Sequence, residues 1–261
     1  MYLLLYILGG VFVLATLFPG VVNTILVHSR QRHPAEPEMT TFEPEELPAE
    51  GAGFFKRMAE ALEREGFTPV VHAVWEPQAT QPRYQMWAVN RETREQALAV
   101  YSQSGIIKSP DAIRYLEFTT QLRNGAQIDT RNSRHLTRTP PFRDKKIYPF
   151  PQITNPRQLL KLHRRLVQRF APYEEAVLPP RGEELEAMRQ GVIRDLQRMR
   201  RMGYLIHDEM EDNYRPTWKG AILMTLRIIW PISTLRRMMR RRRGNQLINT
   251  LLTPGTEPAG S

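Results

Sequence analysis

The stretch Tyr2–Val27, YLLLYILGGVFVLATLFPGVVNTILV, contains no charged side chain. At 1.5 Å per residue, a helix of this length would reach about 39 Å, more than the roughly 30 Å hydrocarbon core of a bilayer. Gly9, Gly10 and the pair Pro19-Gly20 weaken a helix in water but are tolerated in a membrane-spanning helix. The run therefore predicts a transmembrane anchor over residues 1–28 and places the remaining chain at a membrane surface.

Two other interpretations of this run fit less well. A cleaved secretory signal has basic residues before a shorter apolar core, and here nothing basic precedes the run except the amino terminus. A buried core helix is rarely this long or apolar on every face. The first basic side chains, Arg30 and Arg32, follow the run, so the positive-inside rule predicts a single-pass protein with its N-terminus outside and its soluble domains in the cytoplasm. The absence of cysteine agrees with a reducing compartment.

Charge divides the rest of the chain into an acidic and a basic half, although the total is +10. Residues 34–100 carry 12 acidic and 6 basic side chains, a net charge of −6, whereas residues 142–171 carry 8 bases and one acid, a net charge of +7. Residues 181–243 carry 15 bases and 8 acids, again +7. Anionic lipid and nucleic acid are the two partner classes that such a basic half can bind, and a merely solvated basic surface is an equal alternative.

The acidic half is predicted to hold a Pro-rich linker, residues 29–50, and an α+β domain, residues 51–132. Proline and glutamate dominate the linker, although Phe42 and Leu47 can fix its end to the domain. Apolar residues at helical spacing predict a helix over Gly53–Glu65. Runs rich in β-branched and aromatic residues then predict an antiparallel meander, with Asn124-Gly125 as its clearest hairpin turn. The predicted strands are Thr68–Trp75, Tyr84–Asn90, Gln96–Gln103, Ile113–Leu122 and Ala126–Asn132.

A Pro-rich strap, residues 133–156, is expected to have no regular structure and to lead into a helical domain, residues 157–220. Asn155-Pro156 is a favourable helix start, and apolar stripes predict this helix and a longer one over Glu183–Met202. The longer helix also carries a basic stripe of Arg194, Arg198 and Arg201.

After Gly203 the chain reads YLIHDEMEDNYRPTWKGAILM, which predicts a short strand, an acidic loop, a second strand and another helix. This segment resembles the wing of winged-helix domains, in which GYL…YRLTxKG is frequent. The resemblance is clearest over Met202–Ala221 and extends to about residues 156–224. It implies a winged-helix-like domain in which Arg194, Arg198, Arg201 and Lys219 contact nucleic acid or another partner. The acidic residues of Asp208–Asp212 at the wing tip disfavour DNA, because DNA affinity depends on neutralising phosphate charge.

A second apolar run, Ala221–Leu235, is short for a membrane span and contains Arg227 and Pro231. Residues 221–243 are predicted to form an interfacial amphipathic helix with a polybasic flank, which binds membranes through Trp230 and six arginines. These arginines are Arg236, Arg237, Arg240, Arg241, Arg242 and Arg243. The alternative is a core helix followed by a solvated basic tail. Residues 244–261 are expected to be disordered.

Motifs of catalysis are scarce in the sequence. It has no Gly-rich phosphate loop, HExxH motif or cysteine nucleophile, so no catalytic, cofactor or metal residue is assigned. His163 lies on an apolar stripe and is expected to be a hydrogen-bonded core histidine. His207 and Asp208 are adjacent in a predicted strand, so their side chains point to opposite faces and do not form an acid–base pair.

The predicted architecture is thus a transmembrane helix, an α+β domain and a helical, winged-helix-like domain. The predicted function is a non-catalytic interaction or scaffold protein in a membrane-associated assembly, with the anionic bilayer and a membrane protein complex as partners. Two alternatives stay open: a membrane-tethered DNA-binding regulator, and an enzyme or lipid-handling protein without a recognisable motif.

Overall fold

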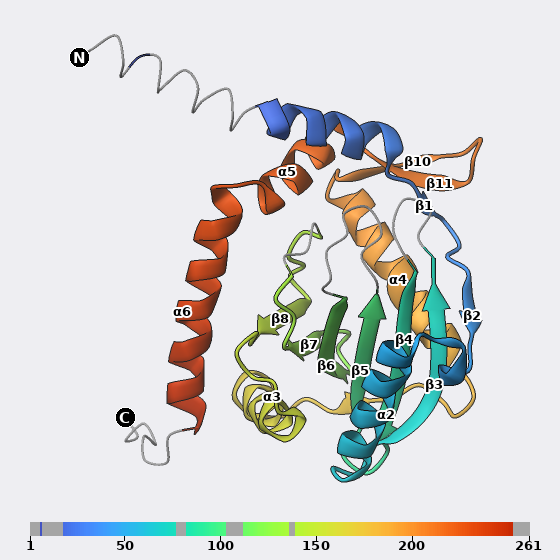
Figure 1. The fold of residues 1–261 in the computed structure, drawn as a ribbon, viewed down its shortest axis with the longest axis vertical. Coiled ribbons are helices and arrows are strands. Elements are labelled where there is room, and N and C mark those ends of the chain that lie inside the picture. Colours follow the sequence, from blue (N-terminus) through green and yellow to red (C-terminus); the bar gives the residue numbers. More distant parts are fainter. Residues whose placement is uncertain (1–5, 7–17, 77–81, 103–111, 136–138, 253–261) are drawn as a thin grey trace.

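A computed structural model describes residues 6, 18–76, 82–102, 112–135 and 139–252. The class is α+β, as predicted, with a large sheet that carries helices on both faces and a smaller sheet beside it (Figure 1). The large sheet has the strand order β2-β3-β4-β5-β6-β7-β8, and all its neighbours on this path are antiparallel except the parallel pair β7–β8. Its strands are β2 (Met39–Thr41), β3 (Thr68–Trp75), β4 (Arg83–Asn90), β5 (Glu95–Ser102), β6 (Ile113–Leu122), β7 (Gln127–Arg131) and β8 (Lys145–Pro149), with β9 (Ala176–Val177) pairing β6.

The predicted meander is confirmed. The strand ends that the structure describes differ from the predicted ends by about one residue at most. The turn at Asn124-Gly125 joins β6 to β7, with Gly125 at φ +84° and the Asn124 side chain accepting a hydrogen bond from the Ala126 amide. Only a residue without Cβ adopts this backbone conformation at no steric cost, so glycine at this position fixes the register of the hairpin.

One face of the large sheet is apolar and is covered by α2 (Ala49–Glu63) and α3 (Pro156–Phe170). Phe55, Phe118 and Leu166 are completely or almost completely buried between these layers. Asn155 caps α3 by accepting hydrogen bonds from the amides of Arg157 and Gln158, as the sequence predicts. Phe42 and Leu47, on either side of the short helix η1 (Pro44–Glu46), also enter this core.

His163 of α3 lies in the middle of this core and is completely buried. Its two ring nitrogens are 2.9 Å and 3.0 Å from the hydroxyl oxygens of Thr120 and Thr130. Burial lowers the pKa of His163 to about 4, so the imidazole is neutral at physiological pH. The prediction of a hydrogen-bonded core histidine is confirmed.

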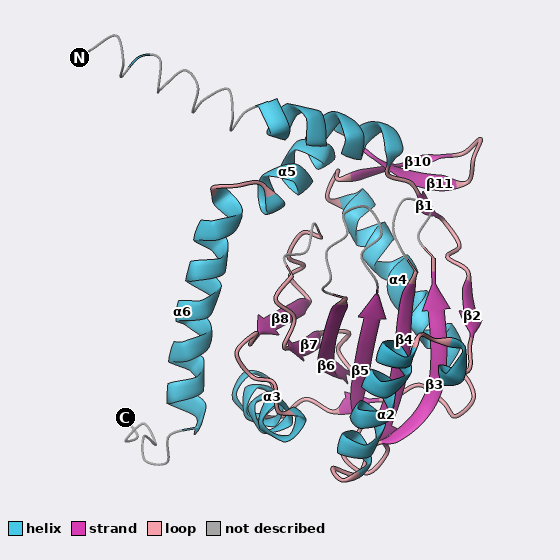
Figure 2. Ribbon diagram, in the orientation of Figure 1, coloured by secondary structure: helices cyan, strands magenta, loops and turns pink. Residues whose placement is uncertain are grey.

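The opposite face of the large sheet is polar, and α4 (Glu184–Arg201) crosses it. Cross-strand neighbours such as Glu117 and Arg131, or Thr119 and Asp129, share this face because paired residues point to the same side. Strands β4 to β7 therefore alternate between apolar side chains under α2 and α3 and mostly polar ones under α4. Figure 2 shows these helices and the strands of the sheet.

A smaller module follows α4. The hairpin of β10 (Leu205–Asp208) and β11 (Asn213–Pro216) pairs with β1 (His33–Pro34), and α5 (Trp218–Ile228) packs beside it. Its core contains Val27, Leu196, Leu205, Tyr214 and Met224, so the N-terminal segment contributes to it. The order helix, hairpin, helix is as predicted, whereas the winged-helix resemblance stays a prediction.

Several predicted domain boundaries differ from the structure. Within the predicted linker, β1 and β2 each pair with a strand of a sheet, because edge strands need only one partner and few apolar residues. Within the Pro-rich strap, Lys145–Pro149 forms β8, since a sheet-edge strand tolerates a terminal proline. Helix α3 packs on the large sheet rather than with the helical domain. Residues 245–252, placed in the disordered tail, are helical, and residues 253–261 lie outside the described part.

The predicted single-pass anchor over Tyr2–Val27 is corrected by the structure. Residues 1–5 and 7–17 lie outside the described residues, and among those described no helix combines the length and apolar character that a membrane span requires. Residues 18–30 are helical, but Val27 at their end is buried in the core of the small module. The prediction of a single-pass membrane protein with cytoplasmic domains is therefore wrong for the described chain. The sequence was misleading because a hydropathy profile does not distinguish an apolar helix packed on a neighbouring helix from one that spans a membrane.

Candidate interaction surface

Residues 18–30 pack antiparallel to α5. The His28 ring stacks on Trp218 at the start of α5, with ring centroids 3.9 Å apart, and its Nδ1 is 2.9 Å from the Pro216 carbonyl oxygen. At the other end, a side-chain carbon added at Gly20 would lie 2.9 Å from Cδ1 of Ile229, just after α5. Two contacts at opposite ends fix the two helices as one unit.

This helix pair exposes apolar side chains to solvent. On α5, the exposed residues Trp218, Ile222 and Leu226 follow each other at intervals of four and so form one stripe. The exposed apolar residues of the N-terminal helix are Phe18, Val21, Val22, Ile25 and Leu26. Because the helices lie side by side, their exposed apolar residues belong to one region of the surface.

Helix α6 (Ile232–Leu252) extends this region away from α5 (Figure 1). Leu235, Met238 and Met239 are 59%, 53% and 47% exposed and face away from the protein. Four arginines of the same helix, Arg237, Arg241, Arg242 and Arg243, are also exposed. We call the exposed apolar residues of 18–30, α5 and α6, together with Trp230 and these four arginines, the α5–α6 surface.

The opposite side of α6 holds the helix on the protein. Leu247, Ile248 and Leu251 pack against the main core, and Ser233 and Gly244 are buried on the same side. Arg236 and Arg240 are half-buried on this inner side. The pKa of Arg240 is lowered by burial first and then by the positive charges of Arg131, Arg236 and Arg227.

Residues 221–243 are therefore not the single interfacial helix expected from the sequence. They form α5 and the first half of α6, with a break at Ile229–Pro231. Of the seven predicted membrane-binding residues, Trp230 and the four exposed arginines lie on the α5–α6 surface, and Arg236 and Arg240 do not face outward. The two groups differ in exposure rather than in helical position, because Arg237 and Arg241 lie seven residues before Gly244 and Ile248 and share their side of the helix.

The residues predicted to contact nucleic acid or another partner are not brought together as one recognition surface. Helix α4 faces the large sheet, and Arg198 is held by ion pairs with Asp195 and Asp144. Arg194 lines a cavity between α4 and the sheet, while Arg201 and Lys219 are exposed. This arrangement does not favour α4 as a helix that enters a DNA groove.

The acidic wing tip has a contact that the sequence did not reveal. His207 Nε2 lies 3.0 Å from Oδ1 of Asp212, five residues away across the hairpin turn, rather than beside Asp208. Among the described residues, no group of three or more His, Cys, Asp or Glu side chains is arranged to hold a metal ion. Among the predicted site residues, only Trp230 and the four exposed arginines are therefore brought together by the described structure, on the α5–α6 surface.

No family model, curated protein or solved structure matches the chain, so its function has to be inferred from its own geometry.

Proposed function

We propose that the chain is an interaction protein that binds anionic lipid surfaces peripherally through the α5–α6 surface, without crossing the bilayer. The observation that carries this proposal is the first half of α6, where exposed apolar side chains and exposed arginines lie together, next to exposed apolar residues of α5 and residues 18–30. Buried apolar area and attraction to anionic headgroups reinforce each other in such a helix.

The chemistry of the surface favours lipid over a protein partner. Trp218 and Trp230 are each more than half exposed, and tryptophan prefers the headgroup region, where its ring is apolar and its N–H stays hydrated. The four exposed arginines lack ion pairs with acidic side chains among the described residues. Their charge is therefore available to phosphate headgroups, at about 1 kcal/mol for each arginine near the surface.

The test is co-sedimentation of the full chain with vesicles of phosphatidylcholine alone and with increasing phosphatidylserine. We expect binding to rise with anionic content and to weaken with salt. Changing Arg237, Arg241, Arg242 and Arg243 to Gln should weaken binding at least tenfold, because up to about 4 kcal/mol of attraction is removed before screening. Changing Leu235 and Met238 to Gln should also weaken it, since both side chains are exposed and contribute little to the fold.

The matched control removes the same charge elsewhere. Four exposed basic residues of α2 and α3 serve for this: Lys56, Arg57, Lys161 and Arg165. Changing them to Gln lowers the net charge by the same amount, and vesicle binding should stay within about twofold of the wild type. Equal losses in the control and in the arginine variant would mean that net charge alone drives binding. That result, or no binding to anionic vesicles, would contradict the proposal.

A further inference from the structure

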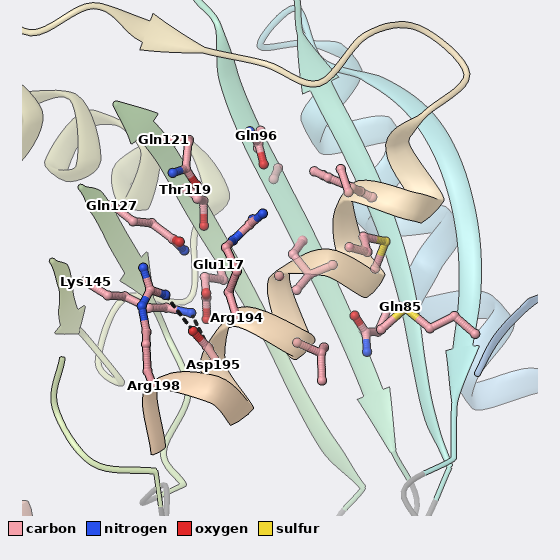
Figure 3. Close-up of a pocket in the computed structure, with 18 residues that line it drawn as sticks. Gln85, Gln96, Glu117, Thr119, Gln121, Gln127, Lys145, Arg194, Asp195 and Arg198 are labelled. Atoms are coloured by element: carbon pink, nitrogen blue, oxygen red, sulfur yellow. Dashed lines mark hydrogen bonds and ion pairs between the residues drawn. The ribbon is translucent and has the colours of Figure 1, made fainter. Parts of the chain in front are cut away.

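A cavity of about 200 Å³ lies between the polar face of the large sheet and α4 (Figure 3). This volume corresponds to about seven water molecules in the liquid, so it suits a small ligand rather than a polymer. Polar groups from β4 to β8 form the floor, and α4 forms the wall. The polar and charged lining residues are Gln85, Gln96, Glu117, Thr119, Gln121, Gln127, Lys145, Arg194, Asp195 and Arg198.

Charged groups around the cavity are largely paired with each other. Lys145 Nζ lies 3.0 Å from Asp195 Oδ2 and 3.7 Å from Asp129 Oδ2. Burial disfavours the Lys145 ammonium, but Asp129, Asp195 and Glu117 outweigh this and raise its pKa. Arg198 pairs with Asp195 at 2.8 Å, and with Asp144. Lys145 and Arg198 are thus neutralised by the aspartates, whereas Arg194 has no ion pair among the described residues.

Glu117 differs, because its partly exposed carboxylate lines the cavity and receives no hydrogen bond from the described residues. Its nearest partner is Nη1 of Arg131, at 3.7 Å, while the Arg131 Nε and Asp129 Oδ2 atoms also lack hydrogen-bond partners. Burial, reinforced by the charge of Asp129, raises the pKa of Glu117 to about 7. Buried polar atoms without partners are rare, and each costs about 1–3 kcal/mol. The Glu117 carboxylate itself lines the cavity, so a ligand there can donate a hydrogen bond to it.

Neutral amides surround this acceptor. Gln85, Gln96 and Gln121 line the cavity, and each side-chain amide offers both a donor and an acceptor. Hydroxyl groups have the same dual character, which makes them the matching partners. Trp87, Leu98 and Val192 complete the lining with apolar surface that suits the C–H face of a small ring.

From this arrangement we propose that the cavity between β4–β8 and α4 binds a neutral polyhydroxylated molecule no larger than a monosaccharide, with the Glu117 carboxylate accepting a hydrogen bond from one of its hydroxyl groups. An anion would meet Glu117 and Asp195, and a cation would meet Arg194 and Lys145, so a neutral ligand avoids both repulsions. The amides bind further hydroxyl groups, and Trp87 contacts the carbon skeleton.

The test is ligand-observed NMR of the full chain with D-glucose, D-galactose, D-mannose and myo-inositol at millimolar concentration. The charged analogues D-glucosamine and D-glucuronate serve as comparison. At about pH 8, where Glu117 is ionised, we expect saturation transfer to at least one neutral compound and weaker transfer to the charged ones. Glu117→Gln should weaken binding at least tenfold, since a hydrogen bond to a charged acceptor is lost.

Two further variants keep the test decisive. Gln96 is half-buried at the cavity, and Gln96→Leu should weaken binding while the fold is retained. This variant decides the outcome if Glu117→Gln does not fold. Glu63→Gln, on the exposed side of α2, should leave binding unchanged. The proposal is overturned if no neutral compound binds, if a charged analogue binds better than its neutral parent, or if binding is the same in Glu117→Gln and Glu63→Gln.

Discussion

Replacing Gly220 by alanine is expected to lower the free energy of unfolding by about 3 kcal/mol or more. A Cβ atom at this position in the first turn of α5 would overlap the carbonyl oxygen of Tyr204 and lie 2.8 Å from its carbonyl carbon. Neither atom can move without shifting the strand that follows Gly203, and Thr217 of the α5 cap is hydrogen-bonded to the same backbone. The clash is therefore relieved only by displacing α5, which would disrupt the small module. Urea denaturation followed by circular dichroism measures the effect.

Gly191→Ala is the matched control in another helix. The nearest atom to an added Cβ there is the Arg194 guanidinium, at 4.0 Å, so the methyl group meets no obstacle. Alanine is favoured over glycine in a helix interior, and we expect stability to rise by about 0.5–1 kcal/mol. Similar stabilities of Gly220→Ala and the wild type would show that α5 is not packed against Tyr204 as described.

The second large effect concerns pH and Glu117. Its pKa is raised from 4.5 to about 7 in the folded protein, so between these values the folded state keeps a proton that the unfolded chain has lost. This contribution is therefore favourable at low pH, declines as pH rises from about 4.5 to 7, and is absent above about 7. Glu117→Gln never ionises. Its stability relative to the wild type should rise by up to about 3 kcal/mol between about pH 4.5 and 8.

The difference between the two proteins is the quantity to measure, because other groups titrate in the opposite sense. Burial lowers the pKa values of His163 and His33 to about 4, so their neutral forms stabilise the fold above about 6.5, and this stability is lost as pH falls. These contributions are common to both proteins and cancel in the difference. Urea midpoints at several pH values, with Glu63→Gln as control, give the result. A constant difference between Glu117→Gln and the wild type would contradict a raised pKa.

The sequence was sufficient for local structure and insufficient for its assembly. Runs rich in β-branched and aromatic residues, together with the Asn124-Gly125 turn, predicted five strands of the meander, because such residues favour a pleated, partly buried surface. Strand β8 was missed because prolines surround it and its own residues show no strand pattern. It forms by pairing with β7. The position of α3 was also missed, since an amphipathic helix shows that it packs but not on which neighbour.

The candidate surface and the cavity show the same limit. The run of arginines was visible, but the helical period does not separate Arg236 and Arg240 from the exposed arginines, because Arg237 and Arg241 lie seven residues before Gly244 and Ile248. Polar residues alternating with Leu116 and Phe118 indicated a polar face of the sheet. Nothing in the sequence showed that α4 would face Glu117 across a cavity on that side of the sheet.

The contact between His28 and the Pro216 carbonyl joins residues 188 positions apart. On a ribosome that adds 5–20 residues per second, Pro216 is synthesised roughly 10 to 40 s after His28. The pairing of β1 with β11 has the same delay. The large sheet up to β8 can form on the nascent chain, whereas the apolar helix of residues 18–30 has no α5 to pack against until residues 218–228 have been synthesised. Chaperone binding to this helix during translation, and its release when α5 emerges, is the expected biosynthetic consequence of closing the small module last.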